Sequence, residues 1–206
     1  MSVAVVSLEK APMQERYKHL LKIITSERFI KMQGLGNEVP FFICPYPSEE
    51  AVEMSRMQKQ LFNTLEKSGV RILVINLYDL AIELLKQRGI FEQVFEIEAS
   101  SGKGAFRELL QGVLDPETHL VPAIADKMAP AEFDVMFLTG VGQVFPYIRS
   151  HRVLNNLQRT ATEHPTVMFF PGVYSHSLEK GASLDLFGRL HDDKYYRAFN
   201  IYHCEI

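Results

Sequence analysis

The residue types best suited to chemistry gather between residues 139 and 159. Thr139-Gly140-Val141-Gly142 follows an apolar run, Val135 to Leu138, that has the character of a buried strand. A predicted helix comes next, from about residue 146 to residue 158. Backbone N–H groups at the start of a helix bind anions, so Thr139, Gly140 and Gly142 are candidate anion-binding residues. Close packing between a strand and a helix requires the same glycines, and this alternative stays open.

The predicted helix that follows carries a stripe of polar side chains. Its members recur at i, i+3, i+7 and i+10, and they are Arg149, Arg152, Asn156 and Arg159. This spacing places them on one helix face. Guanidinium groups pair with phosphates and with carboxylates, so the stripe is a candidate surface for DNA or for an acidic protein partner. An ordinary solvated helix face is the alternative.

Nucleotide-binding signatures are incomplete. A phosphate-binding loop needs G-x-x-x-x-G-K-[ST], but around Gly102-Lys103 the first glycine is replaced by Ile97 and the hydroxyl residue by Gly104. The loop after the first predicted strand, PYPSEE, is acidic and has no lysine. Gly34-Leu35-Gly36 precedes a strand, whereas a dinucleotide fingerprint follows one. The sequence therefore predicts no nucleotide cofactor.

Catalytic and metal signatures are fragmentary as well. The sequence has no G-x-S-x-G nucleophile elbow, and Ser150 and His151 are adjacent on the predicted helix, so their side chains diverge. His191, Asp192 and Asp193 are metal-type ligands in one short segment, and solvated turn residues are the alternative. A metal hydrolase would need further ligands, of which the candidates are His151, His176 and Asp134. We expect no catalytic set, no bound metal and no cofactor.

Composition limits the class of protein. The chain has 206 residues, of which 47% are hydrophobic, and a formal net charge of −3. This length predicts one domain, 1–206, with an N-terminal helical segment, 1–33, packed on it. The negative charge predicts weak DNA binding at most. Two cysteines, Cys44 and Cys204, in apolar strand-like runs, with no secretory signal or membrane-length apolar run, predict free thiols in a cytoplasmic protein.

Strand-like and helix-like patterns alternate along the chain. Short apolar runs predict strands, and amphipathic segments between them predict helices; the strand-like runs are 41–44, 70–77, 135–138, 166–170 and 198–204. This order predicts a three-layer α/β fold. Its sheet has about five strands, is mainly parallel, carries helices on both faces, and is Rossmann-like or degenerate P-loop-like.

Several stretches together resemble the BrxB family of bacterial BREX phage-defence systems. They are GLGNEVPFFI (34–43), INLYDL (75–80), FLTGVGQVFPYIRSHRVLNNLQ (137–158), FFPGVY (169–174) and SLDLFGRLHDDKYYRAF (183–199). The resemblance implies a role in defence within a set that includes a DNA methyltransferase, a large ATPase and PglZ, which has an alkaline-phosphatase-like domain. It carries over no catalytic residue.

The expected function is therefore a non-catalytic component that binds and assembles or regulates other BREX proteins. PglZ is the first expected partner and the large BREX ATPase the second. Tyr195, Tyr196 and Arg197 join the arginine stripe as candidate contact residues, because tyrosine and arginine often anchor interfaces. The alternatives are a degenerate nucleotide- or phosphate-binding enzyme and a DNA-contacting module of the same system.

Overall fold

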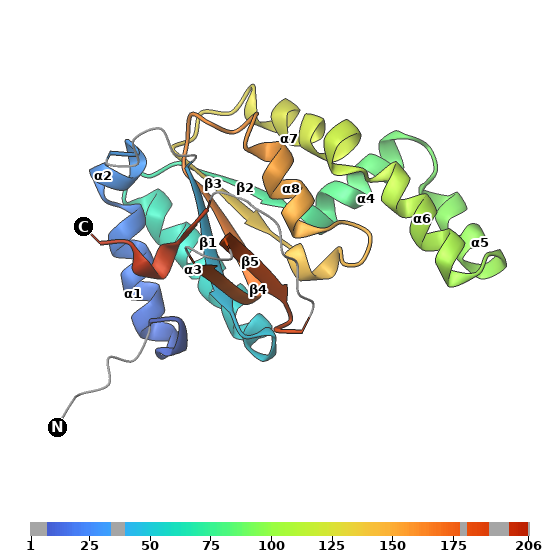
Figure 1. Ribbon diagram of the computed structural model, residues 1–206. Coiled ribbons are helices and arrows are strands. Elements are labelled where there is room, and N and C mark those ends of the chain that lie inside the picture. The colour runs from blue at the N-terminus through green and yellow to red at the C-terminus, as the bar shows by residue number, and fades with distance from the viewer. Residues whose placement is uncertain (1–7, 34–39, 178–180, 190–197, 206) are drawn as a thin grey trace.

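The structure, a computed structural model, describes residues 8–33, 40–177, 181–189 and 198–205. Its six strands lie in the order β2-β3-β4-β1-β6, with β5 paired to β4 (Figure 1). The strand bounds are β1 Phe41–Tyr46, β2 Ile72–Asn76, β3 Val135–Thr139, β4 Thr166–Ser177, β5 Gly181–Leu186 and β6 Phe199–Asn200. All neighbours in the main order are parallel, and β5 runs antiparallel to the second half of β4. The predicted three-layer, mainly parallel fold is confirmed.

Helices cover both faces of this sheet. The α-helices are α1 Met13–Ile24, α2 Glu27–Ile30, α3 Ala51–Lys67, α4 Leu77–Gln87, α5 Phe91–Ser100, α6 Lys103–Val113, α7 Val121–Met128 and α8 Ser150–Leu157. Short helical turns are η1 Leu8–Lys10, η2 Ser48–Glu50, η3 Pro116–Leu120 (a π-helical turn), η4 Val141–Gln143 and η5 Ile201–His203. Figure 1 shows α1 and α3 on one side of the sheet and α4, α7 and α8 on the other.

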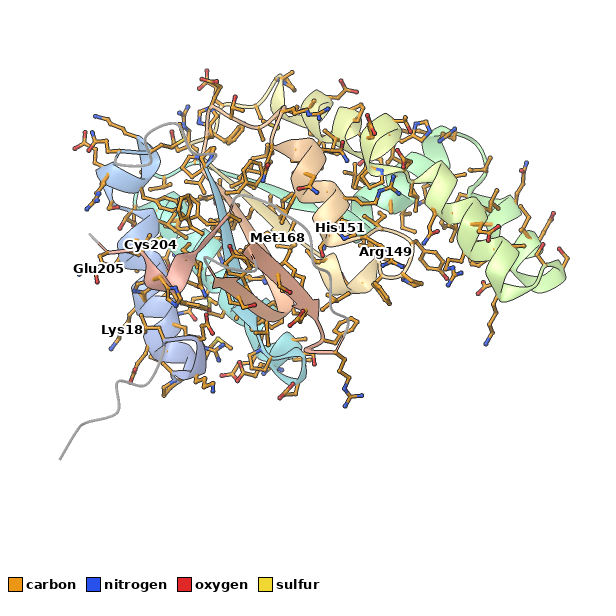
Figure 2. The ribbon with its side chains drawn as sticks, in the orientation of Figure 1. Lys18, Arg149, His151, Met168, Cys204 and Glu205 are labelled. Carbon is orange, nitrogen blue, oxygen red and sulfur yellow. The ribbon has the colours of Figure 1, made fainter. Side chains whose placement is uncertain are left out.

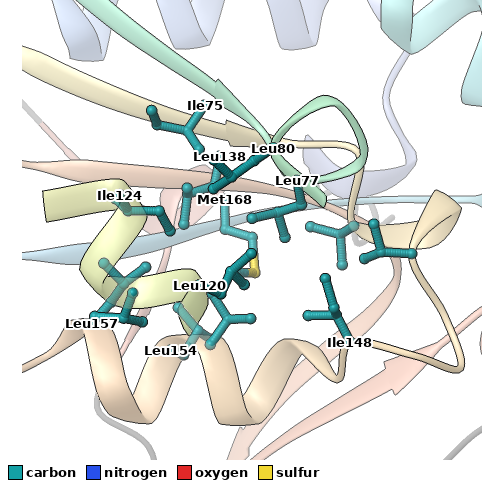
Figure 3. Close-up of a cluster of buried hydrophobic side chains, with 14 of the residues drawn as sticks. Ile75, Leu77, Leu80, Leu120, Ile124, Leu138, Ile148, Leu154, Leu157 and Met168 are labelled. Carbon is teal, nitrogen blue, oxygen red and sulfur yellow. The ribbon is translucent and has the colours of Figure 1, made fainter. Parts of the chain in front are cut away.

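Alternating side chains divide the core between the two faces. In β1, Phe42 and Cys44 pack toward α1 and α3, whereas Phe41 and Ile43 pack toward α4, α7 and α8. All four are buried, as expected for a strand covered on both sides. The larger cluster, on the α8 side, joins leucines and isoleucines of α4, α7 and α8 to Met168 of β4 (Figure 3).

Two predicted strands differ from the observed ones by several residues, and one strand was not predicted. The run 198–204 forms only the two-residue β6, because Asn200 accepts a hydrogen bond from the Tyr202 backbone N–H and caps η5. The strand that was not predicted, β5, lies in a polar, glycine-bearing stretch without an apolar run. It pairs with an extension of β4 past Pro171 and Gly172, where a strand end had been predicted.

Two predicted helical segments are divided or shortened. The N-terminal helical segment, predicted over 1–33, contains two helices, α1 and α2, which are separated at Thr25-Ser26. The Thr25 and Ser26 hydroxyls donate to the carbonyls of Leu21 and Ile23, at 2.8 and 2.7 Å, which competes with regular helical bonding. Helix α8 begins at Ser150, not at residue 146, because Arg149 has an extended backbone (φ −100°, ψ 127°).

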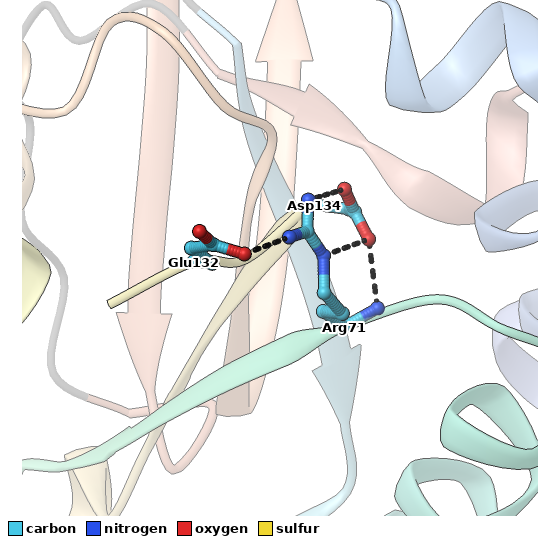
Figure 4. A network of polar contacts seen from close by, with 3 residues as sticks. All are labelled: Arg71, Glu132 and Asp134. Atoms are coloured by element: carbon cyan, nitrogen blue, oxygen red, sulfur yellow. Dashed lines mark hydrogen bonds and ion pairs between the residues drawn. The ribbon is translucent and has the colours of Figure 1, made fainter.

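One ion-pair network fastens the starts of β2 and β3 (Figure 4). Asp134 accepts from the Arg71 backbone N–H at 2.8 Å and from its guanidinium at 2.8 and 3.2 Å, and Glu132 accepts from the same guanidinium at 2.9 Å. Hydrogen bonds from Arg71 lower the pKa of the Asp134 carboxyl. The pair fixes the register at the edge of the sheet.

Candidate functional site

A polar cleft lies between α6, η3 and the segment that leads into α8. Its volume is about 460 Å³, and it is lined by Gln111, Pro116, Tyr147, Arg149 and Arg152. The two arginines are the stripe members nearest the start of α8, and both are exposed. Figure 2 shows Arg149 at this end of α8, on the opposite side of the molecule from Lys18 and Cys204.

Both arginines are positioned by the hydrophobic core beneath them. Arg149 is the N-cap residue of α8, and its carbonyl accepts the first helical hydrogen bonds, from Arg152 N and Val153 N. Ile148, directly before it, is buried, as are the core residues of α8 itself. The guanidinium groups therefore project from a backbone that is anchored on either side of Arg149.

Arg152 already has a carboxylate partner within the cleft. Its guanidinium lies 3.1 Å from Asp115, the N-cap of η3. Partial burial would raise the pKa of the Asp115 carboxyl, but hydrogen bonds from the Thr118 backbone and hydroxyl, together with the charge of Arg152, lower it. Arg149, in contrast, has no ion-pair partner among the residues that the structure describes. Arg149 is thus the cation most available to an incoming carboxylate or phosphate.

Neutral side chains complete the walls of the cleft. The Gln111 amide donates to the Pro146 carbonyl at 3.0 Å, which ties α6 to the segment before α8. The ring of Tyr147 meets Phe106 edge-on, with centroids 6.0 Å apart. The sequence did not indicate that Gln111, Asp115 and Pro116 belong to a site, because glycines and prolines obscure the helical periodicity between residues 90 and 132.

The predicted four-residue stripe is only partly brought together. Arg149 precedes α8 and Arg159 follows it, so the helical spacing holds only for Arg152 and Asn156. The Asn156 amide donates to the Arg152 carbonyl at 2.8 Å and is therefore committed to its own helix. The prediction of one continuous helical face was wrong at both ends, and two of its four residues line the cleft.

The run Thr139-Gly140-Val141-Gly142 packs against other protein segments. Gly140 has φ +74°, and a β-carbon on it would lie 2.3 Å from the Asn76 side-chain oxygen; one on Gly142 would lie 2.9 Å from Pro171. Val141 and Gly142 belong to the three-residue turn η4, and the next α-helix, α8, begins only at Ser150, so the run does not lead directly into a long helix. Both glycines thus serve close approach between loops, which was the alternative to anion binding.

The edge of the sheet where α/β proteins usually bind ligands holds a second cavity. It measures about 270 Å³ and lies beyond the ends of β1 and the parallel part of β4, where the chain connections change sides. Among the residues that the structure describes, its charged lining is Glu9, Glu49 and one cation, Lys10. Two carboxylates beside one lysine disfavour phosphate binding at this position.

The remaining catalytic and metal candidates do not converge in the described ranges. His151 is buried, and Asp134 binds Arg71. Within the described residues, no three His, Cys, Asp or Glu side chains are placed to hold a metal ion. His191, Asp192 and Asp193, the contact candidates Tyr195, Tyr196 and Arg197, and Gly34-Leu35-Gly36 lie outside the described residues, as does the His176 side chain.

Comparison with known proteins decides the family. The family model described as "BREX protein BrxB" matches residues 73–201, a range that contains the arginines of the cleft. The chain belongs to the BrxB family. A BrxB-family protein of Bacillus cereus (strain H3081.97), named BREX protein BrxB, is 38% identical over 195 residues, covering 91% of this chain and 96% of that protein.

A second BrxB-family relative, also named BREX protein BrxB, comes from Escherichia coli O9:H4 (strain HS). It is 31% identical over 189 residues, covering 92% of this chain and 91% of the relative. No solved structure matches this BrxB-family chain. Among the described residues, no helix combines the length and apolar character needed to cross a bilayer.

Proposed function

We propose that this chain is a non-catalytic component of a BREX phage-defence system that acts by binding other BREX proteins. The first candidate partner is PglZ, and the second is the large BREX ATPase. Membership of the BrxB family supports the place in the defence system. The observation that carries the binding role is the arginine-lined cleft, in which Arg149 and Arg152 lie together on an anchored backbone.

The cleft suits an acidic segment of a protein partner. Arg149 offers a planar pair of N–H donors that matches a carboxylate, and Tyr147 supplies an aromatic wall beside it. The backbone at Ile148 and Val153 is fixed by burial, so little ordering of the main chain is needed on binding. A partner carboxylate would share Arg152 with Asp115 and take Arg149 for itself.

A protein partner fits this geometry better than DNA does. Of the described cations, only Arg149 and Arg152 line the cleft, and Arg159 lies beyond the end of α8. Asp115 adds a negative charge within reach of Arg152. A net charge of −3 opposes a polyanion as well. Weak DNA binding at physiological salt is the corresponding expectation.

Co-purification from cells that carry the whole BREX cluster tests this proposal. Arg149→Ala should reduce recovery of PglZ and the ATPase about tenfold or more, because a central arginine can contribute 2 kcal/mol or more to an interface. Arg56→Ala, an exposed arginine of α3 on the other face of the sheet, is the matched control and should change nothing. Equal recovery of PglZ and the ATPase with wild type, Arg149→Ala and Arg56→Ala would refute the role of the cleft.

A further inference from the structure

Helices α5 and α6 form an arm that extends beyond the sheet (Figure 1). Helix α5 is the far part of this arm, and none of its ten residues is buried, although four of them are large and apolar. Phe91, Val94 and Ile97 are half-buried against the main core, whereas Phe95 is 54% exposed. Isolated helices of this length are marginal in water. The apolar side of α5 is therefore only partly covered within the chain.

The charged residues of α5 itself, on either side of Phe95, are all acidic. Glu92 and Glu98 lie one turn before and after it, Glu96 is adjacent, and all three are exposed. Helix α5 has no basic residue, and its last turn, the negative end of the helix dipole, carries Glu98. This end of a helix favours cations, so the carboxylates and the dipole act in the same direction.

A neighbouring aromatic ring of α5 already binds a cation. Phe91, one turn before Phe95, is covered by the Lys86 ammonium, which lies 5.1 Å from the ring centroid. The rings of Phe91 and Phe95 meet edge-on, 5.3 Å apart. Within the described residues, no cation covers the ring of Phe95 in the same way. A cation supplied by another protein would repeat for Phe95 what Lys86 does for Phe91.

We infer that α5 is a docking helix for a protein partner that presents an apolar groove bordered by Lys and Arg side chains. Phe95 enters the groove, and Glu92, Glu96 and Glu98 pair with the basic border, which is helix-in-groove recognition. This surface is separate from the arginine-lined cleft and has the opposite charge. The inference rests on the proposed function in one respect, namely that the protein acts by binding BREX proteins.

Photo-crosslinking in cells that carry the whole BREX cluster tests the inference. A benzophenone amino acid replaces Phe95 in the full-length chain, and in a control it replaces Tyr78, an exposed aromatic residue (46%) at the start of α4. The expected product is a crosslink from position 95 to a BREX protein, at a peptide that has apolar residues flanked by Lys or Arg. Position 78 should give at most a tenth of that yield.

Charge reversal provides the second measurement. Replacement of all three glutamates of α5 by lysine should lower the crosslink yield from position 95 about tenfold; the residues are Glu92, Glu96 and Glu98. In the control, three exposed glutamates outside α5 are replaced by lysine, namely Glu15, Glu53 and Glu66. This variant has the same net charge and should leave the crosslink yield unchanged.

Three outcomes would overturn the inference. They are no crosslink from position 95, a crosslink to a second copy of this chain, and a yield that resists charge reversal. Recovery of the BREX proteins with Arg149→Ala is measured in the same cells, so the two proposals can fail separately. Loss of recovery without a crosslink refutes only the docking helix, and a crosslink with unchanged recovery refutes only the cleft.

Discussion

At the start of β3, Asp134 holds one arginine with both carboxylate oxygens. Asp134→Asn should reduce the free energy of unfolding by about 1 kcal/mol near neutral pH, because charge-assisted hydrogen bonds to Arg71 are weakened. The folded pKa of Asp134 lies below its ordinary value, so this stability is present above about pH 4 and is lost as the pH falls through the folded pKa.

Urea unfolding at pH 7 and near pH 2 measures this effect. The difference between Asp134→Asn and wild type should be largest at pH 7 and should shrink at the acidic end. Glu132→Gln is the control, since the Glu132 side chain is 89% exposed and should contribute little. A difference that stays constant with pH would show that the ionised pair does not stabilise the sheet.

The two thiols should react slowly in the native protein, and at different rates. Burial raises the pKa of Cys44 to about 12 and that of Cys204 to about 11. Cys44 is fully buried and lies 3.3 Å from the Tyr202 hydroxyl, whereas Cys204 is half-buried beyond η5. Thiol titration should therefore find Cys204 reacting first and both thiols reacting at once after denaturation. Immediate native reaction of Cys44 would contradict its burial in β1.

At the scale of elements, the run 139–142 has a structural role that a pair of substitutions can test. Gly140→Ala should destabilise the protein by about 2 kcal/mol, because φ +74° is unfavourable for alanine and the new methyl would displace Asn76, the cap of α4. Gly104→Ala, in open space on α6, should stabilise it by up to about 1 kcal/mol. Equal unfolding midpoints for Gly140→Ala and wild type would show that close packing of this loop does not require glycine at position 140.

Strands that consist almost entirely of apolar residues were predictable from the sequence. The apolar runs of β1 and β3 have no polar interruption, because both faces of these strands are covered. Strand β2 has an equally apolar run, although it lies at the edge of the sheet and Val74 is exposed. Strand β5 was missed because it forms through pairing with β4 and carries few apolar residues. The start of α8 was misplaced because the extended backbone of Arg149 leaves no trace in the spacing of its neighbours.

At the scale of the molecule, the cleft depends on contacts that no local pattern records. The prediction named Arg149 and Arg152, because residue type and spacing are visible in the sequence. It did not name Asp115 or Gln111, which approach from segments about 35 residues away and hold the cleft through one ion pair and one hydrogen bond. The loop glycines illustrate the converse, since Gly140 and Gly142 were candidates for anion binding and their neighbours are Asn76 and Pro171.

The affinity of the purified full-length chain for purified PglZ tests the central claim most directly. Calorimetry at physiological salt would compare wild type, Arg149→Ala and the control Arg56→Ala, with the large BREX ATPase measured in parallel. We predict that Arg149→Ala raises Kd about tenfold or more while changing the free energy of unfolding by less than about 0.5 kcal/mol, and that Arg56→Ala matches wild type. Equal Kd values for all three proteins, or no binding to either BREX protein, would contradict the account.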